Sequence, residues 1–126
     1  MSFTYGRKDK LKSRKLTEEL FAKGRSVSVF PIKVFYTWQP AGGPALLQAG
    51  MGVSARNFRK AVERNRIKRL LREAYRLQKA ELSSTCTDKQ KGMALFFLYV
   101  GKEMPDQALI TDKMRKALSK LAEQIN

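Results

Sequence analysis

The sequence predicts a single α+β domain, and two observations carry that prediction. First, 43% of its 126 residues are hydrophobic, which is close to ordinary globular composition and is enough for a packed core. Second, segments rich in β-branched and aromatic residues are interspersed with segments whose apolar residues recur at helical spacing. A chain of this length corresponds to one domain, so we assign residues 1–126 to it.

The N-terminal end is basic and precedes a predicted short helix. Residues 1–12 are expected to be a flexible segment whose charges either keep it solvated or contact RNA in a complex. Thr17 or Ser13 can cap the helix, and Gly24 is placed to end it.

Four later segments predict strands. Residues 26–29 alternate polar and apolar side chains, and Pro31 interrupts that pattern. Residues 32–38 are rich in β-branched and aromatic side chains. After a loop of Gly and Pro, residues 46–54 predict a returning strand, so we expect the two segments to pair as a hairpin. Residues 95–100 are too apolar for an exposed edge and predict a buried strand.

Two long helices complete the predicted fold. Within residues 57–82 one face, expected to pack on the sheet, comprises Ile67, Leu70, Leu71, Ala74 and Leu77. A final helix is expected to begin near Asp106, just after Pro105. Its apolar stripe, which we assign to the core, comprises Ile110, Met114, Ala117, Leu118, Leu121 and Ile125.

The opposite face of the helix within 57–82 is basic. Asn65, Arg69, Arg72 and Arg76 share that face, and Arg64, Arg66, Lys68 and Lys79 lie beside it. Nine Lys or Arg stand between residues 57 and 79 against two acids, Glu63 and Glu73. A merely solvated face normally mixes signs to form ion pairs, so a polyanionic partner is the better explanation. The net charge of +15 agrees with that, and composition leaves DNA and RNA both open.

Several chemistries are excluded by what the chain lacks. Without His there is no Ser-His or Cys-His pair, and Cys86 alone forms neither an intrachain disulfide nor a cysteine-rich zinc site. The longest apolar stretch, residues 93–100, is too short to span a bilayer as a helix. We therefore expect a soluble, cytoplasmic protein with no membrane partner.

Residues 64–76, RNRIKRLLREAYR, resemble the signature helix of the bacterial ribonuclease P protein family. The resemblance continues through Ala61-Val62, the strand end Gly52-Val53-Ser54, and Leu20-Phe21 with Gly24 three residues after Phe21. It implies a two-layer α–β sandwich with a four-stranded mixed sheet, three helices and a left-handed crossover between parallel strands, an exception to the usual hand.

The resemblance also implies a function. Proteins of the family are subunits of a ribonucleoprotein that removes the 5′ leader of precursor tRNA, with one protein expected per catalytic RNA. The RNA subunit performs the hydrolysis with Mg²⁺ that is held mainly by that RNA and the substrate, and no organic cofactor is implied. The 11 acids are scattered, and Glu18-Glu19 suits a helix dipole, so we expect no catalytic residue and no metal site in the protein.

Site residues follow from the same resemblance. The RNA-binding set comprises Arg56, Arg59, Lys60, Arg64, Asn65, Arg66, Lys68, Arg69, Arg72 and Arg76. A cleft formed by the first helix and one sheet face is expected to hold the single-stranded leader, with Phe21, Val34 and Tyr36 in it. For Phe21, a plain contact between helix and sheet is an equal alternative.

Two other functions compete with this interpretation. Basic α+β domains of this size also occur as structural ribosomal proteins. A DNA-binding module would present a few selective side chains on its recognition helix instead of a stripe about 11 residues long.

Overall fold

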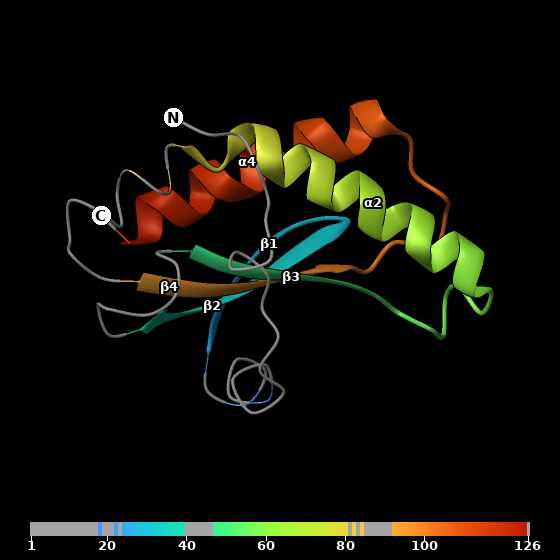
Figure 1. Cartoon of the computed structure of the whole chain (residues 1–126), viewed down its shortest axis with the longest axis horizontal. Helices are drawn as coiled ribbons and strands as arrows, with labels where there is room; N and C mark the ends of the chain where they lie inside the picture. Colours follow the sequence, from blue (N-terminus) through green and yellow to red (C-terminus); the bar gives the residue numbers. More distant parts are fainter. Residues whose placement is uncertain are drawn as a thin grey trace.

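The computed structural model describes residues 24–39, 47–80 and 92–125, together with Glu18, Ala22, Leu82 and Ser84. Within these residues the elements follow in the order β1 (Arg25–Val29), β2 (Ile32–Gln39), β3 (Leu47–Val53), α2 (Ala61–Gln78), β4 (Gly92–Tyr99) and α4 (Gln107–Ile125). Both helices lie on the same face of the four-stranded sheet (Figure 1). The predicted α+β fold with a four-stranded mixed sheet is confirmed.

The predicted first helix lies outside the described residues, apart from Glu18 and Ala22, which are helical and exposed. Phe21 and Thr17 belong to the part that is not described, as does Cys86. The third helix of the prediction therefore stays a prediction.

The sheet has the strand order β1-β2-β4-β3. β2 pairs antiparallel with β1 and with β4, whereas β3 pairs parallel with β4. The hairpin is thus formed by β1 and β2 around Phe30-Pro31, whose peptide bond is cis. The expected hairpin between residues 32–38 and 46–54 is wrong, because β4 lies between those two strands.

The reason for this order lies in the composition of β4. Most of its side chains are buried, on both faces of the strand, and such a strand is most stable in the middle of a sheet. Its parallel partner β3 is reached through a crossover that contains α2. The hand of that crossover stays a prediction.

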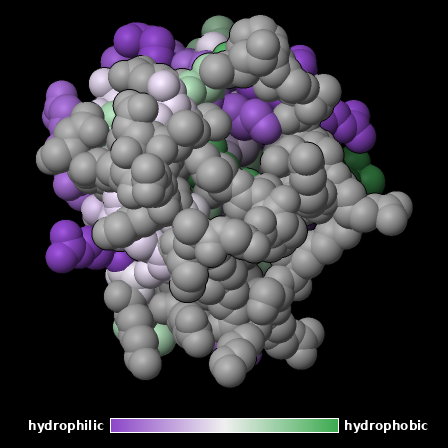
Figure 2. Space-filling model, turned by 60° about the vertical axis from the view of Figure 1, so that its left-hand side comes forward, coloured by the Kyte–Doolittle hydropathy of each residue, from purple (hydrophilic) through white to green (hydrophobic). Residues whose placement is uncertain are grey.

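Strand alternation divides the side chains of β2 between the two faces of the sheet. Ile32, Val34 and Tyr36 are buried in the core shared with the helices. Lys33 and Phe35 alternate with them and so lie on the other face, where they are partly exposed. Figure 2 shows hydrophilic side chains of the described residues mainly toward the upper and left-hand parts of this face of the molecule.

The apolar face of α2 differs in part from the predicted one. Ile67, Leu71 and Ala74 are buried as expected, and Leu70 packs partly against the core. Tyr75, which was not predicted, is also buried, with its ring centroid 5.2 Å from that of Phe97 on β4. Leu77, in contrast, is 48% exposed, so its assignment to the core is wrong. The large Tyr75 ring packs on the central strand β4. Leu77 is two residues further along the helix and therefore points to the opposite, solvent-facing side.

α4 begins where the sequence predicts. The Asp106 carboxylate accepts a hydrogen bond from the backbone N–H of Leu109 at 2.8 Å, which satisfies an otherwise free N–H group of the first turn. Ile110, Met114, Ala117, Leu118 and Leu121 of the predicted stripe are buried, and the side chain of Ile125 is not described. Over the described ranges, no helix has the length and apolar character needed to cross a membrane.

Candidate nucleic-acid interface

The basic face of α2, together with the turn before it, is largely open to solvent. We call the predicted set of ten residues on it the basic surface. Seven are exposed: Arg56, Arg59, Lys60, Asn65, Arg66, Arg69 and Arg72. Three are half-buried: Arg64, Lys68 and Arg76. Helical periodicity places those within α2 away from the sheet because the buried residues occupy the other side of the helix.

A shallow hollow of about 570 Å³ lies in the middle of the basic surface. It is lined by Val62, Asn65, Arg66 and Arg69, which are neighbours at helical spacings of three and four residues. Val62 is 79% exposed, the most exposed of the large hydrophobic residues described. Val62 has no predicted role at the site, although its spacing of three residues from Asn65 and four from Arg66 places it on the same helix face.

Arg64 also has an internal role. Its Nη1 atom donates hydrogen bonds to the backbone oxygens of Phe58 at 2.8 Å and Arg59 at 2.7 Å. Lys60, the residue before the helix, makes no side-chain capping bond. Arg64 thus holds the preceding turn against the first turn of α2, while its Nε and Nη2 groups have no hydrogen bond within the described part of the chain.

At the other end of the basic surface, Arg76 is paired with Glu73. The Arg76 Nη2 atom lies 2.6 Å from the Glu73 Oε1 atom. The hydrogen bond from Arg76 lowers the pKa of Glu73, and the same bond raises the pKa of Arg76. Since this pair neutralises one cation, the uncompensated charge is concentrated toward the N-terminal half of the helix.

The turn that leads into α2 is fixed by contacts with the chain after β4. The Asn57 Nδ2 atom donates to the backbone oxygens of Val100 at 3.5 Å and Gly101 at 3.3 Å. Phe58 is buried, and its ring centroid lies 6.0 Å from that of Tyr99. The turn that carries Arg56, Arg59 and Lys60 is therefore anchored to the end of β4 and the chain after it through Asn57 and Phe58.

The predicted leader-binding residues are not brought together on an open surface. Phe21 is outside the described residues. Val34 is fully buried and Tyr36 is 3% exposed, and the Tyr36 hydroxyl donates to Gln124 Oε1 of α4 at 2.9 Å. The structure thus places Val34 and Tyr36 under the helices, and their contact with a leader stays a prediction. Phe35, on the other sheet face, has the Lys33 Nζ atom 5.0 Å from its ring centroid and was not predicted.

The described acids do not converge on one point, and three of them have partners of their own. Asp112 accepts from Arg115 at 3.0 Å and lies 3.2 Å from Lys116, and both partners lower its pKa. Asp106 caps α4, and Glu73 is paired with Arg76. Among the described residues there is no group of three carboxylate, His or Cys side chains that could hold a metal ion. These side chains therefore do not fit a resident Mg²⁺ ion.

Comparison with known proteins agrees with the resemblance seen in α2. The family model named Ribonuclease P matches residues 5–122. A ribonuclease P protein component from Porphyromonas gingivalis is 32% identical over 124 residues, spanning 98% of this chain and 90% of the relative. One from Chlorobium phaeobacteroides is 33% identical over 126 aligned positions, spanning 91% and 83%.

A solved structure has the same fold. The RNase P protein of Staphylococcus aureus superimposes with a TM-score of 0.66, covering 94% of this chain and 98% of that one. The sequence identity is 19%, so this match bears on the fold alone.

Proposed function

Because the chain belongs to the ribonuclease P protein family, we propose that it binds the catalytic RNA of ribonuclease P through the basic surface of α2. In this role it is the protein component of an endoribonuclease that processes tRNA. One copy would bind each catalytic RNA in the cytoplasm and assist removal of the 5′ leader from precursor tRNA.

The observation that carries the proposal is the one-sided charge of α2. Exposed Arg66, Arg69 and Arg72 belong to no ion pair within the described residues. Like charges on one helix face repel each other, so a polyanion that neutralises them stabilises the arrangement. Planar guanidinium groups suit bidentate contacts with phosphate oxygens. Val62 and Asn65, in the hollow between Arg66 and Arg69, would add an apolar contact and an amide hydrogen bond to that surface.

We assign the hydrolysis to the RNA partner. When bound there, Mg²⁺ would activate water and stabilise developing charge on the phosphate. The protein's part is to hold the RNA and the leader, since its described residues contain no group of three carboxylate, His or Cys side chains that could hold a metal ion.

For the leader, we propose the sheet face opposite the helices. Phe35 and Lys33 combine an aromatic ring with a cation, which is the combination that binds single strands without sequence preference. This differs from the predicted cleft, because it places the leader on the face of Lys33 and Phe35, opposite the face that carries Val34 and Tyr36.

Family membership argues against the structural ribosomal protein, and the length of the basic surface argues against a DNA-reading helix. One reconstitution tests the proposal. Cleavage of a precursor tRNA by a bacterial ribonuclease P RNA is measured at low Mg²⁺ with and without this protein. We expect stimulation with the protein and no cleavage by the protein alone. No stimulation, or cleavage without the RNA, would contradict it.

A further inference from the structure

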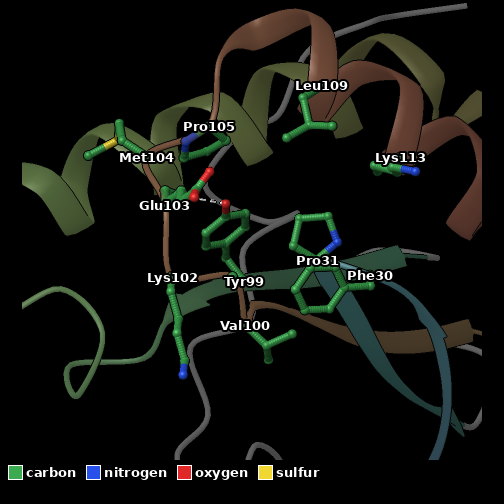
Figure 3. Close-up of a pocket in the computed structure, with 11 residues that line it drawn as sticks. Phe30, Pro31, Tyr99, Val100, Lys102, Glu103, Met104, Pro105, Leu109 and Lys113 are labelled. Carbon is green, nitrogen blue, oxygen red and sulfur yellow. Dashed lines mark hydrogen bonds between the residues drawn. The ribbon is translucent and has the colours of Figure 1, made fainter.

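A second concave surface lies outside the basic surface, between the β1–β2 turn and the start of α4. It is a pocket of about 540 Å³ with a mainly apolar lining (Figure 3). Pro31, Met104 and Leu109 contribute to that lining, together with Tyr99 and Phe30. Neither the resemblance nor the comparisons assign a role to these residues.

The most unusual of them is Phe30. It is 72% exposed at the tip of the β1–β2 turn, although burying a side chain of this size is favourable. An exposed aromatic ring beside an apolar pocket is typical of a binding surface. The ring of Phe30 therefore offers a flat face to a partner.

The pocket is fixed by hydrogen bonds before any partner binds. The backbone N–H of Val100 donates to the Pro31 oxygen at 2.8 Å, which joins the β1–β2 turn to the chain after β4. The Tyr99 hydroxyl donates to the Glu103 backbone oxygen at 2.7 Å, a bond drawn in Figure 3. A side chain at Gly101 would meet the Tyr99 hydroxyl at 2.6 Å, so glycine is needed for this close packing.

The charges at the pocket favour an anion. Lys102 and Lys113 line it, and in Figure 3 they lie on opposite sides of the labelled group. Neither lysine forms an ion pair within the part of the chain that the structure describes. Glu103 is the only acid among the lining residues, which leaves a net cationic rim around an apolar floor.

We propose that this pocket binds an unpaired nucleotide of RNA, with its base stacked on Phe30 and its phosphates held by Lys102 and Lys113. An aromatic ring with flanking cations is the usual arrangement for a single-stranded nucleotide, whereas an apolar peptide would not need the lysines. The choice of RNA as partner rests on the proposed function.

The position of the pocket supports the same partner. Asn57 binds the backbone oxygens of Val100 and Gly101, so the turn at the start of α2 is tied directly to the pocket wall. An RNA strand on the basic surface could therefore continue to this pocket. The protein would then contact RNA at two places joined by one rigid turn.

Binding of the full-length protein to a 12-nucleotide uridine RNA tests the stacking. Phe30→Ala should bind about tenfold more weakly, which corresponds to about 1.4 kcal/mol. Phe30→Trp should bind as well as the unchanged protein, because it keeps a flat aromatic face, and Phe30→Leu should be as weak as Phe30→Ala. Since Phe30 is exposed, these variants should keep their melting temperature. If Phe30→Leu binds normally, the pocket takes an apolar group and no stacked base, and the inference is wrong.

Charge and position are tested separately. Lys113→Ala should weaken binding, whereas Lys116→Ala, on the same helix and outside the pocket, should not. Ultraviolet crosslinking to ribonuclease P RNA should mark the tryptic peptide of residues 26–33, which contains Phe30. Arg66→Ala serves as the reference for the basic surface. If Arg66→Ala weakens binding and the Phe30 and Lys113 variants do not, the pocket proposal fails while the proposed function stands.

Discussion

Arg64 and Arg66 lie two residues apart on α2 and have different surroundings. The Arg64 guanidinium group donates to two backbone oxygens of the preceding turn, whereas Arg66 is exposed and lines the hollow on the basic surface. Sequence periodicity placed both at the edges of the basic stripe and could not distinguish them, because the partners of Arg64 are backbone atoms of a turn. The same two arginines should therefore behave differently when replaced.

We expect Arg64→Ala to lower both stability and RNA binding, and Arg66→Ala to lower RNA binding alone. Removing the charge-assisted bonds of Arg64 should reduce the free energy of unfolding by about 1.5 kcal/mol, at the low end for hydrogen bonds to charged groups because the site is partly exposed. Denaturant unfolding and filter binding to ribonuclease P RNA measure the two quantities. Equal stability of the two variants would contradict the internal role of Arg64.

A second prediction at this scale concerns the Tyr99 hydroxyl. Burial, and to a lesser degree the nearby Glu103 carboxylate, raises the pKa of Tyr99 above its ordinary value of 10.0. The folded protein therefore holds this proton more tightly than the unfolded chain does. The resulting stabilisation is fully present below pH 10.0 and is lost as the pH rises through the raised pKa.

Tyr99→Phe keeps the ring and removes the titrating group. Its melting temperature should be lower than that of the unchanged protein at pH 8, because the bond to the Glu103 oxygen is lost. Between pH 8 and pH 11 the variant should lose less stability than the unchanged protein. Thermal unfolding across this range measures the difference, and parallel curves would show that Tyr99 does not cause the alkaline loss.

At the scale of elements, local patterns predicted the helices and strands better than their pairing. The cap at Asp106 and the apolar stripe of α4 follow from nearby residues, and both are confirmed. The order β1-β2-β4-β3 depends instead on which strand buries both of its faces, and β4 comes last of the four in the chain. A hairpin between the segments that became β2 and β3 is plausible from sequence because they are consecutive. It fails because the apolar β4 takes the place between them.

The alternation of β2 decides which aromatic side chain a leader could reach. Tyr36 is buried against α4, and Phe35 lies on the other face beside Lys33. We expect Phe35→Ala to raise the KM for leader-bearing precursor tRNA about fivefold, at the low end of what one stacked base is worth, with little effect on binding of mature tRNA.

Thr37→Ala is the matched control, since Thr37 alternates onto the same face without an aromatic ring. It should leave leader binding unchanged. Equal losses for precursor and mature tRNA with Phe35→Ala would indicate that Phe35 has a packing role only.

At the scale of the whole molecule, the net charge is +15, and the cations differ in whether an acid is paired with them. Arg76, Arg115 and Lys116 are paired with acids, while most of the basic surface is not. Sequence reasoning found this surface because helical periodicity needs no tertiary information. It did not find the pocket around Phe30, which is assembled from the β1–β2 turn and the segment before α4, far apart in the chain.

Unpaired cations should dominate the salt dependence of RNA binding. Each bound phosphate releases condensed counterions, so the slope of log K against log salt falls by roughly 0.7–0.9 for each phosphate that the protein no longer neutralises. Arg66→Ala should reduce the slope by about that amount. Lys116→Ala removes the same charge, but the Lys116 ammonium already faces Asp112 at 3.2 Å, so the slope should not change.

Affinities measured across a range of salt concentrations for the two variants would therefore separate a localised interface from attraction by net charge. If both variants lower the slope equally, binding follows total charge and the basic surface has no special part. If only Arg66→Ala lowers it, the phosphates lie along α2. The second result is the one we expect, because exposed cations without an acidic partner are the ones free to exchange water and salt ions for phosphate.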